Sequence, residues 1–285
     1  MTSGKPYISA CPVGCDTALV DTSIVMPEGP LTRCPACGQL VSRIGEQAYW
    51  ESMRRFNATG FNLPSPREDA RRFRVAARRL GVISALLAQP ASATRVLDVG
   101  CSRGNFLAAG VRLGYRMEGV EPAPDIAAAA RAAGLDVHTG LLQDVAFPDA
   151  SFDAVTLFEV IEHLQEPIAL LRECRRVLKP RGILLVSTGN TASWTAAAMR
   201  ERWDYLQIAK DAGHISFFNP RSIAVIAGRS GFAVERIATS RVKFHEKADV
   251  PRWRYALGKF VAEILGLPAQ FAQRGHDMLA YLRRC

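Results

Sequence analysis

The chain has 285 residues, a hydrophobic content of 48% and a formal net charge of +9. These values leave room for one large α/β domain with a sizeable core plus a small extra module. No apolar run approaches the roughly 20 residues that a membrane span needs, and the first residues lack the apolar stretch of a signal peptide, so we expect a cytoplasmic protein. An odd number of cysteines, seven, argues against a disulfide framework.

Two cysteine pairs near the N-terminus predict a small zinc-ribbon-like module over residues 1–45. Cys11 and Cys15 form the first pair, and Cys34 and Cys37 form the second after 18 intervening residues. Four thiolates match one tetrahedral, structural Zn²⁺ and leave no open position for catalysis. The first pair has three intervening residues where two are commoner, and the alternative interpretation is four free thiols.

Short apolar runs at 18–20 and 23–26 are predicted to be the two strands of a hairpin between the cysteine pairs. Nothing between the cysteines is notably basic or aromatic. We therefore do not expect the module to contact nucleic acid.

Residues 46–90 are predicted to hold a connector and a long helix over 67–88, in which apolar residues recur at helical spacing. We interpret the opposite face of this helix as solvent-exposed, and an anion-binding face is the alternative. Its arginines are Arg67, Arg71, Arg72, Arg74, Arg78 and Arg79.

Residues 91–285 alternate between strand and helix patterns, which implies a doubly wound, mostly parallel sheet. The first strand, 95–99, is apolar and β-branched, as in a strand buried on both faces, and it leads through a glycine-containing turn into a helix over 104–113. The other expected strands cover 116–121, 135–138, a run ending at Phe158, 183–188, 232–238 and 278–282.

Two acidic residues define the ligand expected at the carboxyl ends of these strands. Asp98 lies two positions before Gly100, where a carboxylate disfavours a pyrophosphate and suits a cationic group. Glu121 ends the second strand and can accept hydrogen bonds from both hydroxyls of a ribose. A ligand with a ribose, an ammonium group and no phosphate fits S-adenosylmethionine.

The sequence Asp98-Val-Gly100-Cys-Ser-Arg-Gly104 followed by Glu121 resembles the first motifs of the class I S-adenosylmethionine-dependent methyltransferases. Ser151-Phe152-Asp153 and Leu178-Lys-Pro180-Arg-Gly182 resemble later motifs of the same superfamily. The resemblance implies a seven-stranded Rossmann-like sheet. It also implies cofactor contacts from Asp98, Gly100, Ser102, Gly104, Glu121, Pro122, Leu141, Leu142 and Phe158.

The loop after the third strand departs from the family pattern. Relatives often place an acid directly after the glycine to meet the adenine amine, whereas this chain has Leu141 after Gly140. Adenine contact by an acid then depends on Asp144.

The triplet Glu159, Glu162 and His163 resembles one that binds magnesium in the ubiquinone-pathway O-methyltransferases. A helix beginning near Glu159 would place all three side chains on one face. Because the same letters recur in the superfamily without a metal, we expect the acids to cap and orient the turn rather than to hold Mg²⁺.

The acceptor is expected at the carboxyl edge of the sheet, under a polar and aromatic loop over 189–218. His214 in this loop is our first candidate for a general base, and His163 is the second. An insertion over 246–276 is apolar on one side and basic at its start. Its stretch 251–267 could lie on a membrane surface or form a dimer face, and we expect it to pack on the domain.

The predicted function is methyl transfer from S-adenosylmethionine to a small molecule. The zinc-ribbon pattern and the segment that begins at Gly213-His214 resemble methyltransferases of sugar and polysaccharide pathways, which favours an acceptor such as an anionic nucleotide-linked sugar or glycan precursor. The alternatives are a quinone or small-metabolite O-methyltransferase, an RNA or protein methyltransferase, and a non-catalytic cofactor-binding scaffold.

Overall fold

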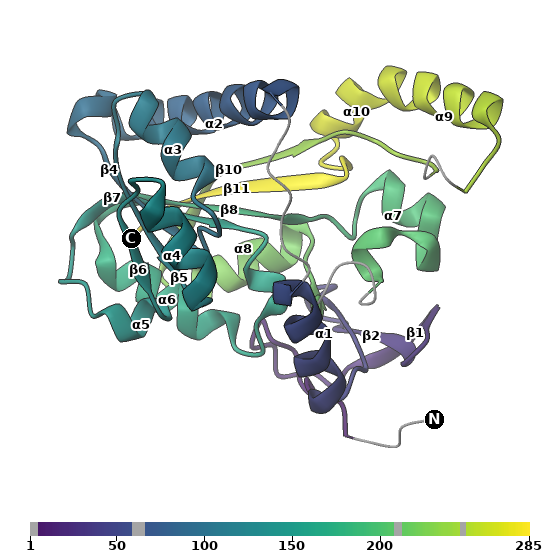
Figure 1. The fold of residues 1–285 in the computed structure, drawn as a ribbon. Coiled ribbons are helices and arrows are strands. Elements are labelled where there is room, and N and C mark those ends of the chain that lie inside the picture. Colours follow the sequence, from purple (N-terminus) through teal and green to yellow (C-terminus); the bar gives the residue numbers. More distant parts are fainter. Residues whose placement is uncertain (1–4, 59–65, 208–212, 246–248) are drawn as a thin grey trace.

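The computed structural model describes residues 5–58, 66–207, 213–245 and 249–285. Its centre is a seven-stranded sheet in the order β10-β11-β8-β7-β4-β5-β6 (Figure 1). All neighbouring strands pair in parallel except β11, which is antiparallel to both β8 and β10. The doubly wound, mostly parallel fold predicted from the sequence is therefore confirmed. The bounds are β4 (Arg95–Val99), β5 (Arg116–Glu121), β6 (Val137–Thr139), β7 (Phe152–Phe158), β8 (Leu178–Gly189), β10 (Phe232–Ser240) and β11 (Asp277–Arg284).

Helices cover both faces of this sheet, and each face has its own hydrophobic core. Successive side chains of β4 point to opposite faces of the sheet, so Val96 belongs to one core and Leu97 to the other. The first core is covered by α2 (Pro66–Leu87), α3 (Asn105–Arg112) and α4 (Pro124–Ala132). The second is covered by α5 (Leu142–Val145), α6 (Pro167–Val177) and α8 (Pro220–Arg229).

The N-terminal residues form a second, four-stranded sheet in the order β1-β2-β3-β9. Its strands are β1 (Val20–Met26), β2 (Gly29–Arg33), β3 (Leu40–Val41) and β9 (Ser216–Phe217). The predicted hairpin between 18–20 and 23–26 is wrong, because Val20 and all of the run 23–26 lie in the single strand β1. The chain reverses only after Met26, which pairs with Gly29 across a two-residue turn.

The last strand of this small sheet comes from the loop expected to cover the acceptor. β3 pairs with β9 through Leu40 opposite Phe217 and Val41 opposite Ser216. A shared hydrophobic cluster reinforces the pairing. It contains Met26, Leu31, Leu40, Met199, Trp203, Tyr205, Leu206 and Phe217. The N-terminal module is thus packed against the segment expected to cover the acceptor, beside α7 (Trp194–Met199).

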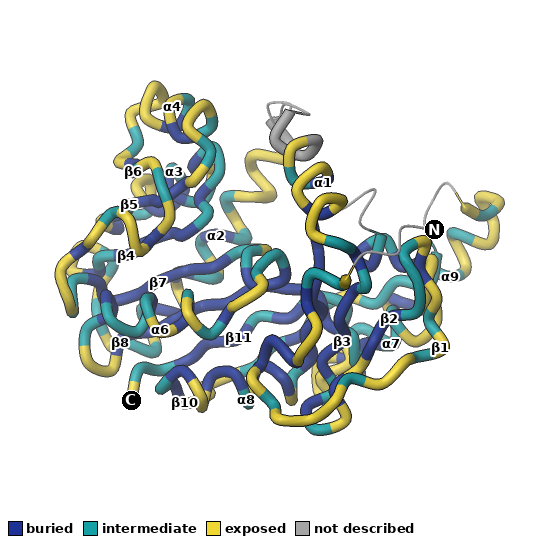
Figure 2. The backbone as a smooth tube through the Cα atoms, turned by 90° about the horizontal axis from the view of Figure 1, so that it is seen from below, coloured by how far each residue is buried: buried dark blue, intermediate teal, exposed yellow. Residues whose placement is uncertain are grey.

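Two further helical segments lie at the periphery. α1 (Glu46–Ala58) connects the N-terminal sheet to the main domain, and α9 (Arg252–Ile264) with α10 (Gly266–Phe271) forms the insertion between β10 and β11. Figure 2 shows α9 as a mostly exposed helix at the edge of the molecule. The insertion packs on the domain, as expected, through the buried Ala262 and Ala269, but the large apolar side chains of α9 are exposed. Among the described residues, no helix combines the length and apolar character needed to cross a bilayer.

Candidate functional site

A carboxylate at the end of β5 forms a hydrogen bond with the turn that follows β4. Glu121 is buried, and its two oxygens accept hydrogen bonds of 2.9 Å from the backbone N–H groups of Ser102 and Ala123. A carboxylate has about four lone-pair positions, so each oxygen can still accept one ligand hydroxyl. The position suits the two hydroxyls of a ribose, as the sequence predicts.

The backbone conformation of the turn explains its glycines. Gly100, Ser102 and Gly104 all have positive φ angles, of 74°, 51° and 76°. A Cβ atom on Gly104 would also lie 2.3 Å from a methyl carbon of Leu135, and one on Gly100 would lie 2.9 Å from Val160. These glycines are therefore required by packing within the protein as well as by the tight turn.

Asp98 lies at the floor of the same site. It is 2% exposed and accepts a 2.6 Å hydrogen bond from the hydroxyl of Thr156 on β7. Burial raises the pKa of Asp98 to about 7, against the opposing effects of the Thr156 hydrogen bond and the charge of Arg79. A carboxyl group with a pKa near 7 would favour a cationic ligand group, because the cation would stabilise the ionised form.

Arg79 from α2 reaches this site, which the sequence did not predict. Its guanidinium lies 4.7 Å from the ring centroid of Phe158, at the end of β7, and burial lowers its pKa. Phe158 also meets Phe106 edge-on at 4.6 Å. The interpretation of the α2 arginines as wholly solvent-exposed is thus wrong for Arg79, which brings a positive charge close to Asp98.

The remaining predicted cofactor residues surround the ends of β5 and β6. Pro122 and Leu141 are exposed, whereas Leu142 is 1% exposed and belongs to the core. Asp144 accepts a 3.3 Å hydrogen bond from the backbone N–H of Leu141 and so caps α5. Asp144 is exposed and makes this bond within its own turn, and Leu141 presents an apolar side chain at this edge.

A second cluster of ionisable residues lies where β7 and β8 end. Ligand atoms of Glu162, His163 and His214 all lie within 4.8 Å of one another. Glu162 is completely buried and accepts hydrogen bonds from the hydroxyls of Tyr205, at 2.7 Å, and Thr188, at 3.2 Å. The structure thus brings together both histidines that the sequence singled out.

Tyr205 orients His214 as well as Glu162. The backbone carbonyl of Tyr205 lies 3.0 Å from Nδ1 of His214, which places a proton on that nitrogen when the imidazole is neutral. The other nitrogen, Nε2, lies 4.0 Å from a carboxylate oxygen of Glu162. The His163 ring is 4.7 Å from the His214 ring, and burial lowers the pKa of His163 to about 4.

The N-terminal module holds this cluster in place through backbone hydrogen bonds. The N–H of Ile215 donates to the carbonyl of Glu162, and the N–H of Ser42 donates to the carbonyl of Ile215, both at 2.9 Å. From α1, the Tyr49 hydroxyl donates to the carbonyl of His163 at 2.8 Å. Segments far apart in the sequence therefore position the two histidines.

Glu159 does not share a helical face with Glu162 and His163, although its carboxyl interacts with that of Glu162. A short 3₁₀ turn covers Ile161–His163, and Glu159 itself has a positive φ of 55°, so no helix places the three predicted side chains on one face. Glu159 accepts a hydrogen bond from Ser187, and burial together with the nearby Glu162 raises its pKa.

The four predicted zinc ligands come together in the N-terminal module. Their sulfur atoms lie within 4.8 Å of one another, and those of Cys11 and Cys37 are 3.6 Å apart. Tetrahedral Zn–S bonds of about 2.3 Å require sulfur separations of about 3.8 Å, so the arrangement fits one zinc ion. Thr17 contacts the Cys34 sulfur at 3.2 Å, and Asn219 at the start of α8 donates to the carbonyl of Cys37.

Sequence reasoning missed three residues of these sites: Arg79, Thr156 and Tyr205. Arg79 is one of several arginines on α2, and no local pattern distinguishes it from the exposed ones. Tyr205 lies in an irregular aromatic segment, where only tertiary contacts reveal its partners.

The chain matches a family model described as a methyltransferase domain over residues 49–237. Among curated relatives, two proteins named ubiquinone biosynthesis O-methyltransferase align over 196 residues, which are 63% of this chain and 81% of each relative. The protein of Xanthomonas oryzae pv. oryzae (strain PXO99A) is 40% identical, and that of Xanthomonas axonopodis pv. citri (strain 306) is 32% identical. The protein of the same name from Xanthomonas campestris pv. campestris (strain B100) is 34% identical over 156 residues, 51% of this chain and 64% of that relative.

Solved structures share the fold at lower identity. An S-adenosylmethionine-dependent methyltransferase from Archaeoglobus fulgidus has a TM-score of 0.52 at 20% identity and covers 75% of this chain and 94% of its own. One from Mesorhizobium loti has a TM-score of 0.50 at 21% identity, with coverages of 72% and 96%. Together with the family match, these likenesses show that the chain is an enzyme of the class I S-adenosylmethionine-dependent methyltransferases.

Proposed function

We propose that this methyltransferase acts on a hydroxyl group of a small, quinone-type acceptor. The curated relatives carry names from ubiquinone biosynthesis, which favours this alternative over the sugar or glycan acceptor that the sequence patterns suggested. The single observation that carries the chemistry is the placement of His214. Its Nδ1 is bonded to the Tyr205 carbonyl, and its Nε2 faces the buried Glu162.

The proposed role of this arrangement is to remove the proton of the acceptor hydroxyl. Nε2 of neutral His214 takes the proton as the acceptor oxygen attacks the methyl carbon. The carboxylate of Glu162, 4.0 Å from Nε2, stabilises the positive charge that the imidazole gains. Tyr205 keeps both groups aligned, and the buried surroundings exclude water from the reacting atoms.

The residues around the β4 turn fit the cofactor that the superfamily uses. In this proposal Glu121 holds the ribose, Asp98 meets the ammonium group, and the exposed Leu141 contacts the adenine edge. S-adenosylmethionine, when bound, supplies an electrophilic methyl carbon on a good leaving group. The protein therefore contributes mainly alignment and proton removal.

We assign zinc to the cysteine cluster in a structural role and propose no magnesium at Glu162. The two oxygens of Glu162 already accept hydrogen bonds from Tyr205 and Thr188, which accounts for this buried carboxylate without a metal ion. Methyl transfer should then withstand a chelator for as long as the zinc stays bound.

A competition between acceptor classes tests the proposal. Labelled S-adenosylmethionine is supplied with catechols and quinols in one set and with nucleotide sugars in another, and methylated products are separated by mass. We expect label in a catechol or quinol, and about a 100-fold or greater loss of turnover in His214→Asn with unchanged cofactor affinity. His138→Gln, at a half-exposed histidine on β6, is the matched control. Label confined to nucleotide sugars, or full turnover in His214→Asn, would refute the acceptor or the base, respectively.

A further inference from the structure

We propose that α9 and α10 form a docking surface for an anionic lipid bilayer. The two helices present large apolar side chains to solvent, which we name the α9–α10 apolar face. Their exposed fractions run from 57% to 89%. The face consists of Trp253, Leu257, Phe260, Ile264, Leu267 and Phe271.

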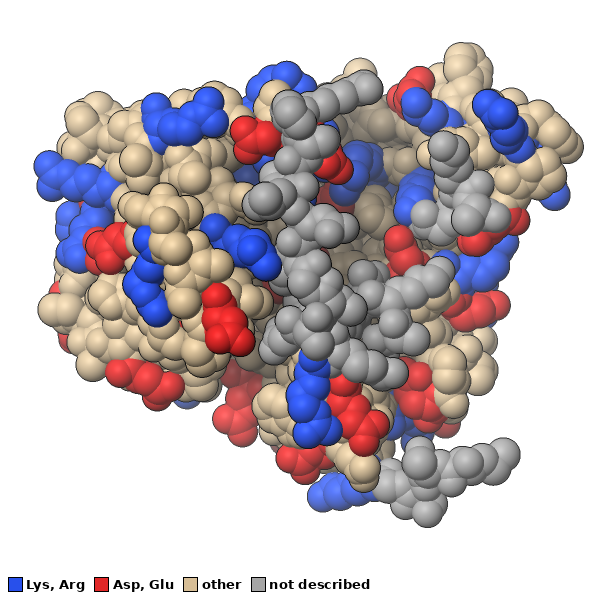
Figure 3. Space-filling view, in the orientation of Figure 1, with Lys and Arg blue, Asp and Glu red and all other residues tan. Residues whose placement is uncertain are grey.

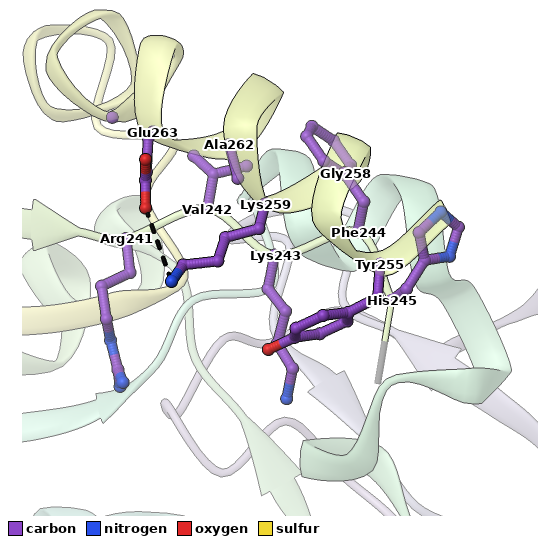
Figure 4. Close-up of a pocket in the computed structure, with 11 residues that line it drawn as sticks. Arg241, Val242, Lys243, Phe244, His245, Tyr255, Gly258, Lys259, Ala262 and Glu263 are labelled. Atoms are coloured by element: carbon purple, nitrogen blue, oxygen red, sulfur yellow. Dashed lines mark ion pairs between the residues drawn. The ribbon is translucent and has the colours of Figure 1, made fainter. Parts of the chain in front are cut away.

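The apolar face is separate from the side of α9 that holds the helix to the protein. Positions 253, 257, 260 and 264 follow the helical spacing of three and four residues and so share one side of α9. The opposite side turns Tyr255, Gly258 and Ala262 toward a pocket of about 280 Å³ (Figure 4). The outward apolar residues are therefore not needed to attach the helix.

The chemistry of α9 is that of a helix that lies in a membrane interface. Such helices combine aromatic residues and leucine on one face with arginine and lysine beside them. In α9, Arg252 and Arg254 accompany the apolar face, whereas Lys259 lines the pocket and its ammonium group lies 3.8 Å from the carboxylate of Glu263, the acidic residue of the helix. Exposed apolar clusters on soluble proteins usually mark an interaction site.

Positive charge on a neighbouring helix favours an anionic membrane as the occupant. In Figure 1, α2 lies along the same side of the molecule as α9 and α10, above the sheet. Four arginines on α2 are exposed: Arg71, Arg72, Arg74 and Arg78. Blue side chains are visible along this upper edge in Figure 3. Basic residues near an anionic bilayer add electrostatic attraction to the membrane.

A second copy of the chain fits this face less well. A two-fold interface would bring the apolar face, with its basic neighbours, against itself, and like charges would meet at its margins. A bilayer of anionic lipids instead complements both the apolar face and the arginines. The surface does not depend on which acceptor is methylated.

Docking would also bring the bilayer near the acceptor side of the enzyme. The wall of the pocket beneath α9 includes Lys243, whose backbone N–H donates to Thr195 at 2.8 Å and whose ammonium group lies 3.5 Å from Asp204. Both partners belong to the segment expected to cover the acceptor. The pocket thus lies between the docking face and that segment.

Vesicle flotation of the full chain tests the proposal. The probes are vesicles of phosphatidylcholine alone and of equal parts phosphatidylcholine and phosphatidylglycerol. We expect binding to the anionic vesicles, weakened by salt, and at least about a tenfold loss of partitioning in the double variant Phe260→Ser, Ile264→Ser. Val111→Ser removes an equally exposed apolar side chain from α3 and should bind as the wild type does.

A second measurement guards against misfolded variants. Anionic vesicles should shift the tryptophan emission of the wild type to shorter wavelength, and Trp253→Phe should abolish the shift while retaining binding of S-adenosylhomocysteine. Failure of the wild type to bind anionic vesicles overturns the proposal, as does equal binding by the double variant. A dimer in solution that dissociates in the double variant, without vesicle binding, would assign the face to a second copy.

Discussion

The hydroxyl of Tyr205 donates a 2.7 Å hydrogen bond to Glu162, while the backbone carbonyl of the same tyrosine holds Nδ1 of His214. One residue therefore orients both the proposed base and the carboxylate behind it. Tyr205 is itself fixed by stacking on the fully buried Trp203, with ring centroids 5.1 Å apart. Its rigid placement makes the pair a sensitive point for catalysis.

Tyr205→Phe should reduce kcat by about tenfold or more while cofactor affinity stays unchanged. The variant leaves the buried Glu162 with one hydrogen bond fewer, which costs about 1–3 kcal/mol. Steady-state kinetics and calorimetric titration with S-adenosylhomocysteine measure the two effects. Tyr115→Phe is the matched control, because it also removes a 2.7 Å hydrogen bond, to Ser84, but lies away from the cluster. Equal loss of kcat in both variants would contradict a local role for Tyr205.

Cofactor affinity should rise with pH between about 6 and 8 because of Asp98. Burial raises the pKa of this carboxyl to about 7 in the cofactor-free protein, so part of the population is protonated at neutral pH. A bound ammonium group favours the ionised form, and binding therefore releases a proton. Titration with S-adenosylhomocysteine at several pH values checks this. Asp98→Asn should bind about tenfold or more weakly, without the pH dependence, whereas the exposed Asp125→Asn should bind normally. Affinity that is flat with pH in the wild type would contradict the contact.

The cysteine cluster should hold one zinc ion per chain. Metal analysis of protein purified without added zinc should find it, and Cys37→Ser should lose it, whereas Cys285→Ser alters an exposed cysteine at the other end of the chain and should retain it. Because β3 pairs with β9, we also expect loss of zinc to lower the melting temperature and turnover together. Full turnover by a zinc-free chain would show that the module does not support the acceptor side.

His163 should make the fold less stable in mild acid. Burial lowers the pKa of His163 to about 4 in the folded protein, whereas an unfolded histidine has a pKa of about 6.5. Between these pH values the unfolded chain binds a proton that the folded chain does not. The free energy of unfolding therefore decreases as the pH falls from about 6.5 to about 4, by up to about 3 kcal/mol. Urea unfolding across this range should show a smaller decline in His163→Gln than in the wild type. Identical declines in the two proteins would exclude His163 as the source.

The parts of the fold that were predictable from the sequence depend on local patterns. The bounds of β4 and β5 agree with the prediction, because a buried apolar run and a glycine turn delimit each one. β8 begins at Leu178, five residues before its predicted start. Leu178-Lys-Pro-Arg-Gly has the composition of a turn, yet Leu178 pairs with Phe152 on β7.

The acceptor side was only partly predictable. His163 and His214 could be selected as titratable residues near strand ends, but their contact with Glu162 depends on pairings between distant segments, such as Ile215 with Glu162. The insertion that contains α9 shows a second limit of prediction from sequence. Periodicity reveals that α9 has an apolar side, but it does not reveal whether protein or solvent faces that side.

The pairing of β3 with β9 has a consequence for how this enzyme could be shortened or recombined. β9 is the edge of its sheet and pairs with β3 alone, and the hairpin side chains Met26 and Leu31 cover the same cluster as Trp203. If the residues before α1 were deleted, the aromatic cluster around Trp203 would be uncovered and β9 would have an open edge. Both features promote aggregation. The N-terminal module, with its hairpin and its four cysteines, is thus not an interchangeable appendage. A descendant that discarded it would need compensating substitutions around Trp203 to remain a working protein.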